Sequence, residues 1–74
     1  MAKTFSGKQV VQILIQSFGF RFVSQKGSHV KLRRRINGRT VTTVVPMHRE
    51  LAPGTLHGVL KLAEINEEEF RNAV

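Results

Sequence analysis

The most constraining feature of this sequence is the pair Asn37-Gly38, which lies between two runs of strand-like residues. Asn-Gly is among the strongest two-residue signals for a tight β-hairpin, because the favoured turn needs a positive φ angle at both positions. Residues 29–35 precede the pair, and residues 39–45, rich in Val and Thr, follow it and end at Pro46. We therefore expect an antiparallel strand pair in the middle of the chain.

A third strand is expected over residues 20–25. It is separated from residues 29–35 by Lys26-Gly27-Ser28, a short turn that contains the glycine such turns favour. The three strands then follow one another directly, and short connections of this kind join antiparallel neighbours.

Helices are expected before and after the three strands in the sequence. Ser6 and Gln9 have the spacing of a capping box, an apolar stripe follows them, and Gly19 supplies a residue suited to a left-handed helix end. Pro53 suits the first position of a second helix. Asn66 can cap a short final helix whose first turn is acidic. The apolar positions with helical spacing are Val10, Val11, Leu14, Ile15 and Phe18 in the first helix and Leu56, Val59, Leu60 and Ala63 in the second.

The expected order is α-β-β-β-α with a short C-terminal helix, in a single domain over residues 1–74. We predict an α+β fold in which a three-stranded antiparallel sheet has one face covered by helices.

The charge of the chain is strongly uneven. The formal net charge is +7, and residues 1–49 hold ten Lys and Arg without a single acidic residue. Such an asymmetry favours a polyanionic partner, of which nucleic acid is the obvious candidate, although a basic surface can also serve solubility alone.

The absence of cysteine excludes disulfides, thiolate catalysis and the usual zinc frameworks. The chain also lacks a long apolar run and a signal-peptide core. We therefore expect a cytoplasmic protein without a membrane anchor and without a cofactor.

The run 29–35 concentrates the charge on one face of a strand. Alternation places Val30, Leu32 and Ile36 on one face and cationic side chains, about 7 Å apart, on the other. Arg34 interrupts the apolar face, and we expect its head to reach water near the hairpin end. The opposite face carries His29, Lys31, Arg33 and Arg35.

His29 is the candidate catalytic residue. Histidine suits proton transfer near neutral pH, and the neighbouring cations can hold phosphate. In RNA the 2′-hydroxyl is a nucleophile beside the scissile phosphate, so a base and cationic stabilisation suffice for cleavage without a metal. A lone histidine is more often structural or simply exposed, and this alternative stays open.

The remaining histidines and the phenylalanines are weaker candidates. His48, in the loop after the third strand, is a possible secondary residue, whereas His57 is expected at the rim of the second helix. The three histidines match no familiar metal-ligand spacing, so we predict no metal site. The five Phe residues could stack bases, but their positions favour a core role for all five.

Several segments together resemble one known family. These are Ser6-Gly7-Lys8 with its apolar stripe, Gly19-Phe20, residues 25–29, Val45-Pro46-Met47-His48 and residues 50–56. In this order and spacing they resemble the HicA toxins of bacterial toxin–antitoxin pairs.

The resemblance implies a double-stranded-RNA-binding-domain-like fold, cleavage of mRNA that arrests translation and growth, and a HicB-type antitoxin covering the active site. It places the catalytic histidine at His29. This chain departs mildly from the family after the histidine, where it has Val30-Lys31-Leu32 and the family often has an aromatic or small polar residue. The difference bears on substrate preference more than on activity. The expected RNA-binding residues are Lys26, Gly27, Ser28, Lys31, Arg33 and Arg35.

Two other functions remain open at this point. The chain could be a non-catalytic RNA-binding module, because the expected fold and charge fit both. It could also serve mainly as a protein-interaction partner, with its basic face built for an acidic antitoxin.

Overall fold

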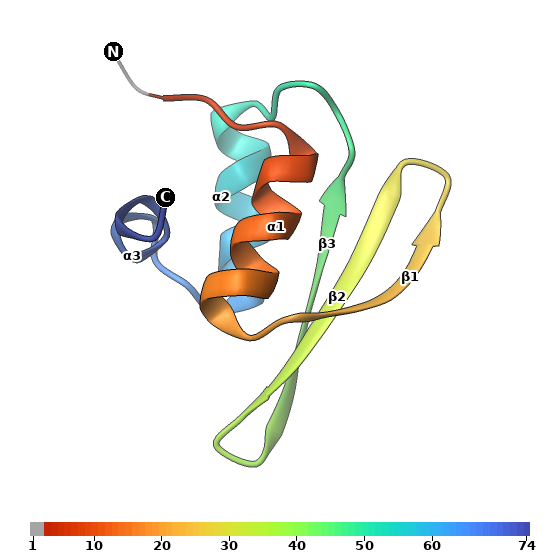
Figure 1. The fold of residues 1–74 in the computed structure, drawn as a ribbon, viewed down its shortest axis with the longest axis vertical. Coiled ribbons are helices and arrows are strands. Elements are labelled where there is room, and N and C mark those ends of the chain that lie inside the picture. The colour runs from red at the N-terminus through yellow and green to blue at the C-terminus, as the bar shows by residue number, and fades with distance from the viewer. Residues whose placement is uncertain (1–2) are drawn as a thin grey trace.

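The computed structural model describes residues 3–74 and confirms the predicted order of elements (Figure 1). Each strand begins and ends within one residue of its predicted bounds. The elements are α1 (Gly7–Phe18), β1 (Arg21–Lys26), β2 (His29–Ile36), β3 (Arg39–Pro46), α2 (Pro53–Ala63) and α3 (Glu67–Asn72).

The local signals in the sequence act as predicted. At the start of α1, the Ser6 hydroxyl accepts from the Gln9 amide at 3.1 Å, and the Gln9 side chain accepts from the Ser6 amide at 2.9 Å. Asn37 and Gly38 have φ angles of 51° and 77°, the left-handed conformation that a tight hairpin needs. The Asn66 side chain accepts from the third residue of α3 at 2.7 Å and so caps that helix.

β2 is the central strand of an antiparallel sheet ordered β1-β2-β3. The pairing of β2 with β3 is unbroken from His29 opposite Pro46 to Ile36 opposite Arg39. The pairing of β1 with β2 shifts between Phe22 and Ser24, which leaves one extra residue in β1. The edge strand is therefore less regular than the central pair.

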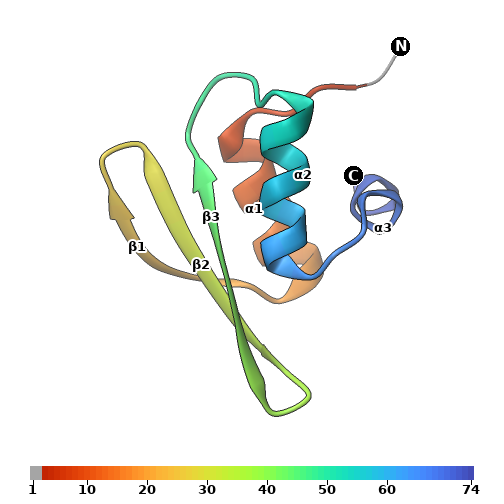
Figure 2. The same ribbon diagram turned by 180° about the vertical axis from the view of Figure 1, so that it is seen from behind.

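Both long helices pack on β3, and β1 lies at the other edge of the sheet (Figures 1 and 2). The core between sheet and helices includes Leu14, Leu32 and Leu60, each at most 2% exposed. One buried polar group also joins the layers, since the Thr43 hydroxyl donates to the Val59 carbonyl at 2.8 Å. The helices thus cover one face of the sheet, mainly over β3 and β2.

Phe22 shows where this cover ends. It pairs with the buried Leu32 and therefore lies on the helix-facing side, yet its side chain is 56% exposed. All six residues of β1 are exposed, because the helices do not extend over this edge strand. The prediction of a core role for all five Phe residues is wrong at Phe22, while Phe5, Phe20 and Phe70 are buried.

Arg34 does not reach water as predicted. Its guanidinium donates to the carbonyls of Phe18 at 3.0 Å and Ala63 at 3.3 Å, the last residues of α1 and α2, and stacks 4.8 Å from the Phe20 ring centroid. Carbonyls at helix C-termini lack partners within the helix and carry partial negative charge, so they attract a cation. Arg34 therefore joins the sheet to both helix ends, and the prediction of a solvent-exposed head is wrong.

Candidate nucleic-acid interface

The sheet face that points away from the helices is here called the open face. The burial of β2 alternates as predicted, with Val30 and Leu32 buried on the helix side. The four β2 side chains of the open face, His29, Lys31, Arg33 and Arg35, are all exposed. Their strand partners add Arg21, Ser24 and Lys26 from β1 and Thr40, Thr42, Val44 and Pro46 from β3. The structure thus brings the predicted cations together around one strand.

His29 lies at one end of this face, beside the turn that joins β1 to β2. It pairs with Lys26 on one side and Pro46 on the other. The turn needs its glycine, since Gly27 has a φ of 59°. The Ser28 carbonyl accepts from the Met47 amide at 2.6 Å, so the loop after β3 is fixed to the residue before His29.

His48 lies in that same loop, two residues beyond the strand partner of His29, and its side chain is exposed. Its carbonyl accepts from the Gly7 amide at 2.9 Å. A Cβ at Gly7 would lie only 2.1 Å from the Pro46 carbonyl oxygen. The first residue of α1 therefore packs directly on the backbone of this loop, a role for Gly7 that the sequence analysis missed.

Near the β2–β3 hairpin, at the other end of β2, lies a hollow rich in arginine. Arg21 is paired directly with Arg33 across the strands. Arg33 Nε donates to the Thr42 hydroxyl at 3.2 Å, and Arg35 donates to the Gly38 carbonyl at 3.2 Å. The hollow is lined by Gly19, Arg21, Arg33, Arg34, Arg35 and Thr40. Arg21 was not among the predicted site residues, although alternation along residues 20–25 is a signal for its face.

The ion pairs of the described residues do not involve the cations of the open face. In residues 3–74 the ion pairs are Arg39 with Glu64 and Arg71 with Glu67. The Arg39 guanidinium hydrogen-bonds the Glu64 carboxylate and lowers the pKa of Glu64. The cations of the open face enter neither pair, so their positive charge is left for a polyanion.

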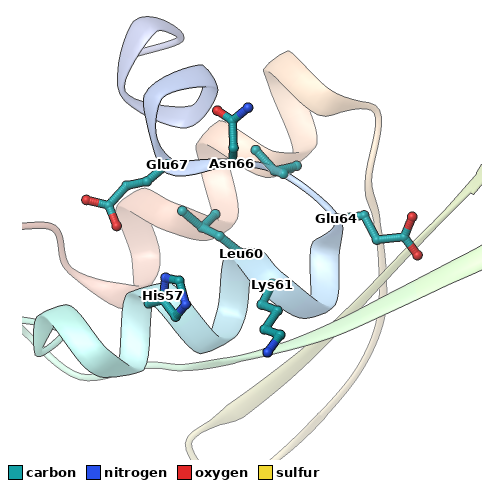
Figure 3. A pocket seen from close by; sticks show the side chains of 7 residues that line it. His57, Leu60, Lys61, Glu64, Asn66 and Glu67 are labelled. Carbon is teal, nitrogen blue, oxygen red and sulfur yellow. The ribbon is translucent and has the colours of Figure 1, made fainter.

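A second hollow lies between α2 and α3 (Figure 3). Glu64 and Glu67 lie at its opposite ends, with Leu60 between them. His57 and Lys61 also line it, and His57 is exposed as predicted. Because its charges are mixed, this hollow is poorly suited to a polyanion. Within residues 3–74, no three His, Asp or Glu side chains are grouped as a metal site would require.

The fold and the charge define the class: a small α+β domain whose antiparallel sheet leaves one face open and basic. A family model described as "HicA toxin of bacterial toxin-antitoxin" matches residues 7–65. The chain therefore belongs to the HicA toxin family of bacterial toxin–antitoxin systems. None of the curated proteins matches it.

Membership in this family implies an antitoxin partner. The match includes the open face, the turn before His29 (here called the histidine turn) and the loop after β3, and it ends before α3. Among the described helices, none has the length and apolar character needed to span a membrane.

Proposed function

We propose that this toxin is a metal-independent endoribonuclease that cleaves mRNA on the open face and thereby arrests translation and growth. The observation that carries the proposal is the exposed histidine at the end of a cationic strand, on a face whose cations enter no ion pair in the described residues. RNA is the polyanion that carries its own nucleophile, the 2′-hydroxyl.

In the proposed reaction, His29 takes the proton from a 2′-hydroxyl as that oxygen attacks the adjacent phosphorus. The new bond joins the 2′-oxygen to phosphorus, and the bond to the 5′-oxygen breaks. The 5′-oxygen leaves with a proton from an acid or from water, giving a 2′,3′-cyclic phosphate and a 5′-hydroxyl. Lys26 and Lys31, which flank His29 on the open face, stabilise the charge that develops on the phosphate oxygens.

His48 is the proposed secondary acid–base residue. The loop that carries it is fixed beside His29 through the hydrogen bond from the Met47 amide to the Ser28 carbonyl. Gly27 and Ser28 shape the turn and offer backbone amides to a phosphate, while Arg33 and Arg35 extend the contact along β2.

We further propose that a HicB-type antitoxin neutralises the toxin in the cytoplasm by covering the open face and His29. An antitoxin that does so needs an acidic or otherwise complementary surface, because the face presents uncompensated cations. Binding there would exclude RNA and proton transfer together.

A defined RNA incubated with the protein in EDTA tests the proposal. We expect shortened RNA with 2′,3′-cyclic phosphate ends. We also expect no cleavage of a matched RNA with 2′-deoxyribose at the mapped cleavage position, because that substrate lacks the nucleophile. Cleavage only with added metal, or equal cleavage of the deoxy substrate, would contradict the mechanism.

The second candidate function is a non-catalytic RNA-binding module, which the basic open face also favours. The same experiment separates the two functions. A mobility shift of both RNAs with no shortening of either would favour the binding module.

A further inference from the structure

The strand pairing places two arginines directly opposite each other at the hairpin end of the open face, Arg21 on β1 and Arg33 on β2. Like charges in directly opposed positions destabilise a sheet. Neither arginine enters an ion pair in the described residues, so no carboxylate there relieves this repulsion. A bound anion would relieve it, which marks the pair as a place suited to a negatively charged group.

The surrounding groups fit a phosphate. Arg35 lies on the same face as Arg33, and both line the arginine-rich hollow with Arg21. The hydrogen bonds to Thr42 and Gly38 orient the Arg33 and Arg35 side chains and use one donor of each guanidinium. A guanidinium has five N–H donors in a planar fork that matches phosphate oxygens, so several donors remain on each.

Arg34 is also among the residues that line this hollow, and its guanidinium lies on the helix-facing side of the sheet. Its guanidinium is bound to the ends of α1 and α2, and its Nε is buried without a hydrogen-bond partner. Because Arg34 is held by the helix ends, its contribution to the field of the hollow does not depend on ordering a mobile side chain.

We propose that Arg21, Arg33 and Arg35, named here the arginine cluster, form a second phosphate-binding subsite for single-stranded RNA, about two to three nucleotides from the phosphate at His29. The distance follows from the strand. Same-face positions are about 7 Å apart, comparable to the phosphate repeat of an extended strand. Two steps from His29 to Arg33, which is paired with Arg21, therefore span about 14 Å, and three steps to Arg35 span roughly 20 Å. Lys31 lies between the two ends.

The subsite rests on the proposed function for its meaning, because only a nuclease has a scissile phosphate to be positioned. It also goes beyond that function, since it assigns Arg21 a role and gives the substrate a minimum length. RNA that extends on the cluster side by at least two to three nucleotides can reach the arginine cluster, whereas shorter RNA cannot. The cluster acts on binding of the substrate and leaves the chemical step at His29 unchanged.

Binding measurements test the subsite independently of cleavage. Fluorescence anisotropy would give the Kd of 2′-O-methyl RNA oligonucleotides, which lack the nucleophile, at lengths of two to eight nucleotides. The variants are Arg21→Gln and the double change Arg21→Gln/Arg33→Gln. The control is Arg39→Gln, which removes the same charge from an exposed arginine that pairs with Glu64 outside the cluster.

We expect Arg21→Gln to weaken binding of the eight-nucleotide RNA by about 3- to 10-fold and the double change to weaken it further. Binding of the two-nucleotide RNA should be unchanged in both. The slope of log Kd against log salt concentration should flatten by about 0.7 for each phosphate that the variant no longer neutralises. Arg39→Gln should match the wild type at every length, and thermal melting would verify that each variant is folded.

Equal weakening at both lengths would reduce the cluster to general charge and overturn the subsite, as would unchanged binding of the long RNA. Failure of the proposed function has a different signature. In that case the wild type leaves cleavable RNA intact, while the length-dependent loss of binding in the cluster variants still decides whether the phosphate subsite exists.

Discussion

Replacing His29 with alanine is expected to abolish detectable RNA cleavage and to leave the fold and RNA binding in place. Acid–base catalysis by a positioned side chain contributes about 10²- to 10⁴-fold to a rate. The single-turnover rate constant in EDTA should therefore fall at least about 100-fold. Because Lys31 and the arginine cluster are untouched, the Kd for RNA should change little.

The fold should survive this change because the His29 side chain is exposed and the residue is held in the sheet by its backbone. Exposed substitutions away from caps, cores and strained positions change stability by about 0.5 kcal/mol or less. The melting temperature of His29→Ala should accordingly match the wild type, which separates loss of catalysis from loss of structure.

The other two histidines provide graded controls. His57→Ala changes an exposed histidine on α2, lining the hollow between α2 and α3, and should cleave at the wild-type rate. The cleavage rate of His48→Ala should lie between those of His29→Ala and His57→Ala, because the loop that carries His48 is fixed beside the histidine turn. Undiminished cleavage by a clean preparation of His29→Ala would remove His29 from the mechanism. A loss confined to His48→Ala would move the chemistry to the loop after β3.

The sequence was sufficient to predict the elements and the β2 side chains of the open face, because those depend on neighbouring residues. The capping pair Ser6 and Gln9, the hairpin pair Asn37-Gly38 and the alternation along residues 29–36 are all local signals. The role of the resulting face in RNA cleavage, and of His29 in particular, is a prediction from chemistry and family resemblance that the cleavage experiments decide.

The predictions for Phe22 and Arg34 are wrong because both depend on how the helices are placed over the sheet. Alternation gives the face to which Phe22 belongs, but the lateral reach of the helices decides that Phe22 is 56% exposed. The prediction for Arg34 is wrong because it assumed that a charged side chain on an apolar face reaches solvent, whereas the Arg34 guanidinium binds carbonyls inside the fold. The carbonyls that bind it instead belong to Phe18 and Ala63, which are far from it in the sequence.

The position of Arg21 escapes prediction for a related reason. Its place opposite Arg33 depends on the register of β1, and that register shifts between Phe22 and Ser24. An extra residue in an edge strand changes which side chains face each other, and no local pattern marks it. Alternation along residues 20–25 indicates the face on which Arg21 lies, but its pairing with Arg33, and hence the arginine cluster, follows only from the observed register.

Among the glycines of this chain, Gly7 is the one at which an added methyl group would meet the closest contacts, so replacing it with alanine is expected to destabilise the fold strongly. The new Cβ would lie 2.1 Å from the Pro46 carbonyl oxygen and 2.8 Å from the Met47 Cα. Both are backbone atoms, so no side-chain rotation can relieve the clash. Overpacking of this kind costs about 1–3 kcal/mol and sometimes more. For a domain of this size, we expect the melting temperature to fall by about 4–8 °C per kcal/mol.

Gly58→Ala is the matched control. Gly58 lies within α2, and nothing is found within 4 Å of its Cβ position. Because alanine favours a helix interior over glycine by about 1 kcal/mol, this variant should melt at or above the wild-type temperature. Two changes of the same chemistry, both in helices, should thus shift stability in opposite directions. A Gly7→Ala protein as stable as Gly58→Ala would contradict the close packing of α1 on the loop after β3.

The same substitution also tests whether that packing matters to the proposed site. The Gly7 amide donates to the His48 carbonyl. In the same loop, the Met47 amide donates to the carbonyl of Ser28, the residue before His29. A methyl group at Gly7 that displaces the Pro46–Met47 backbone should therefore disturb the histidine turn through this short chain of contacts. We expect Gly7→Ala, measured well below its melting temperature, to cleave RNA more slowly with little change in Kd, because the arginine cluster lies at the opposite end of β2. Loss of stability without loss of rate would show instead that the loop supports the fold alone and that His29 is positioned by the β1–β2 turn and the sheet.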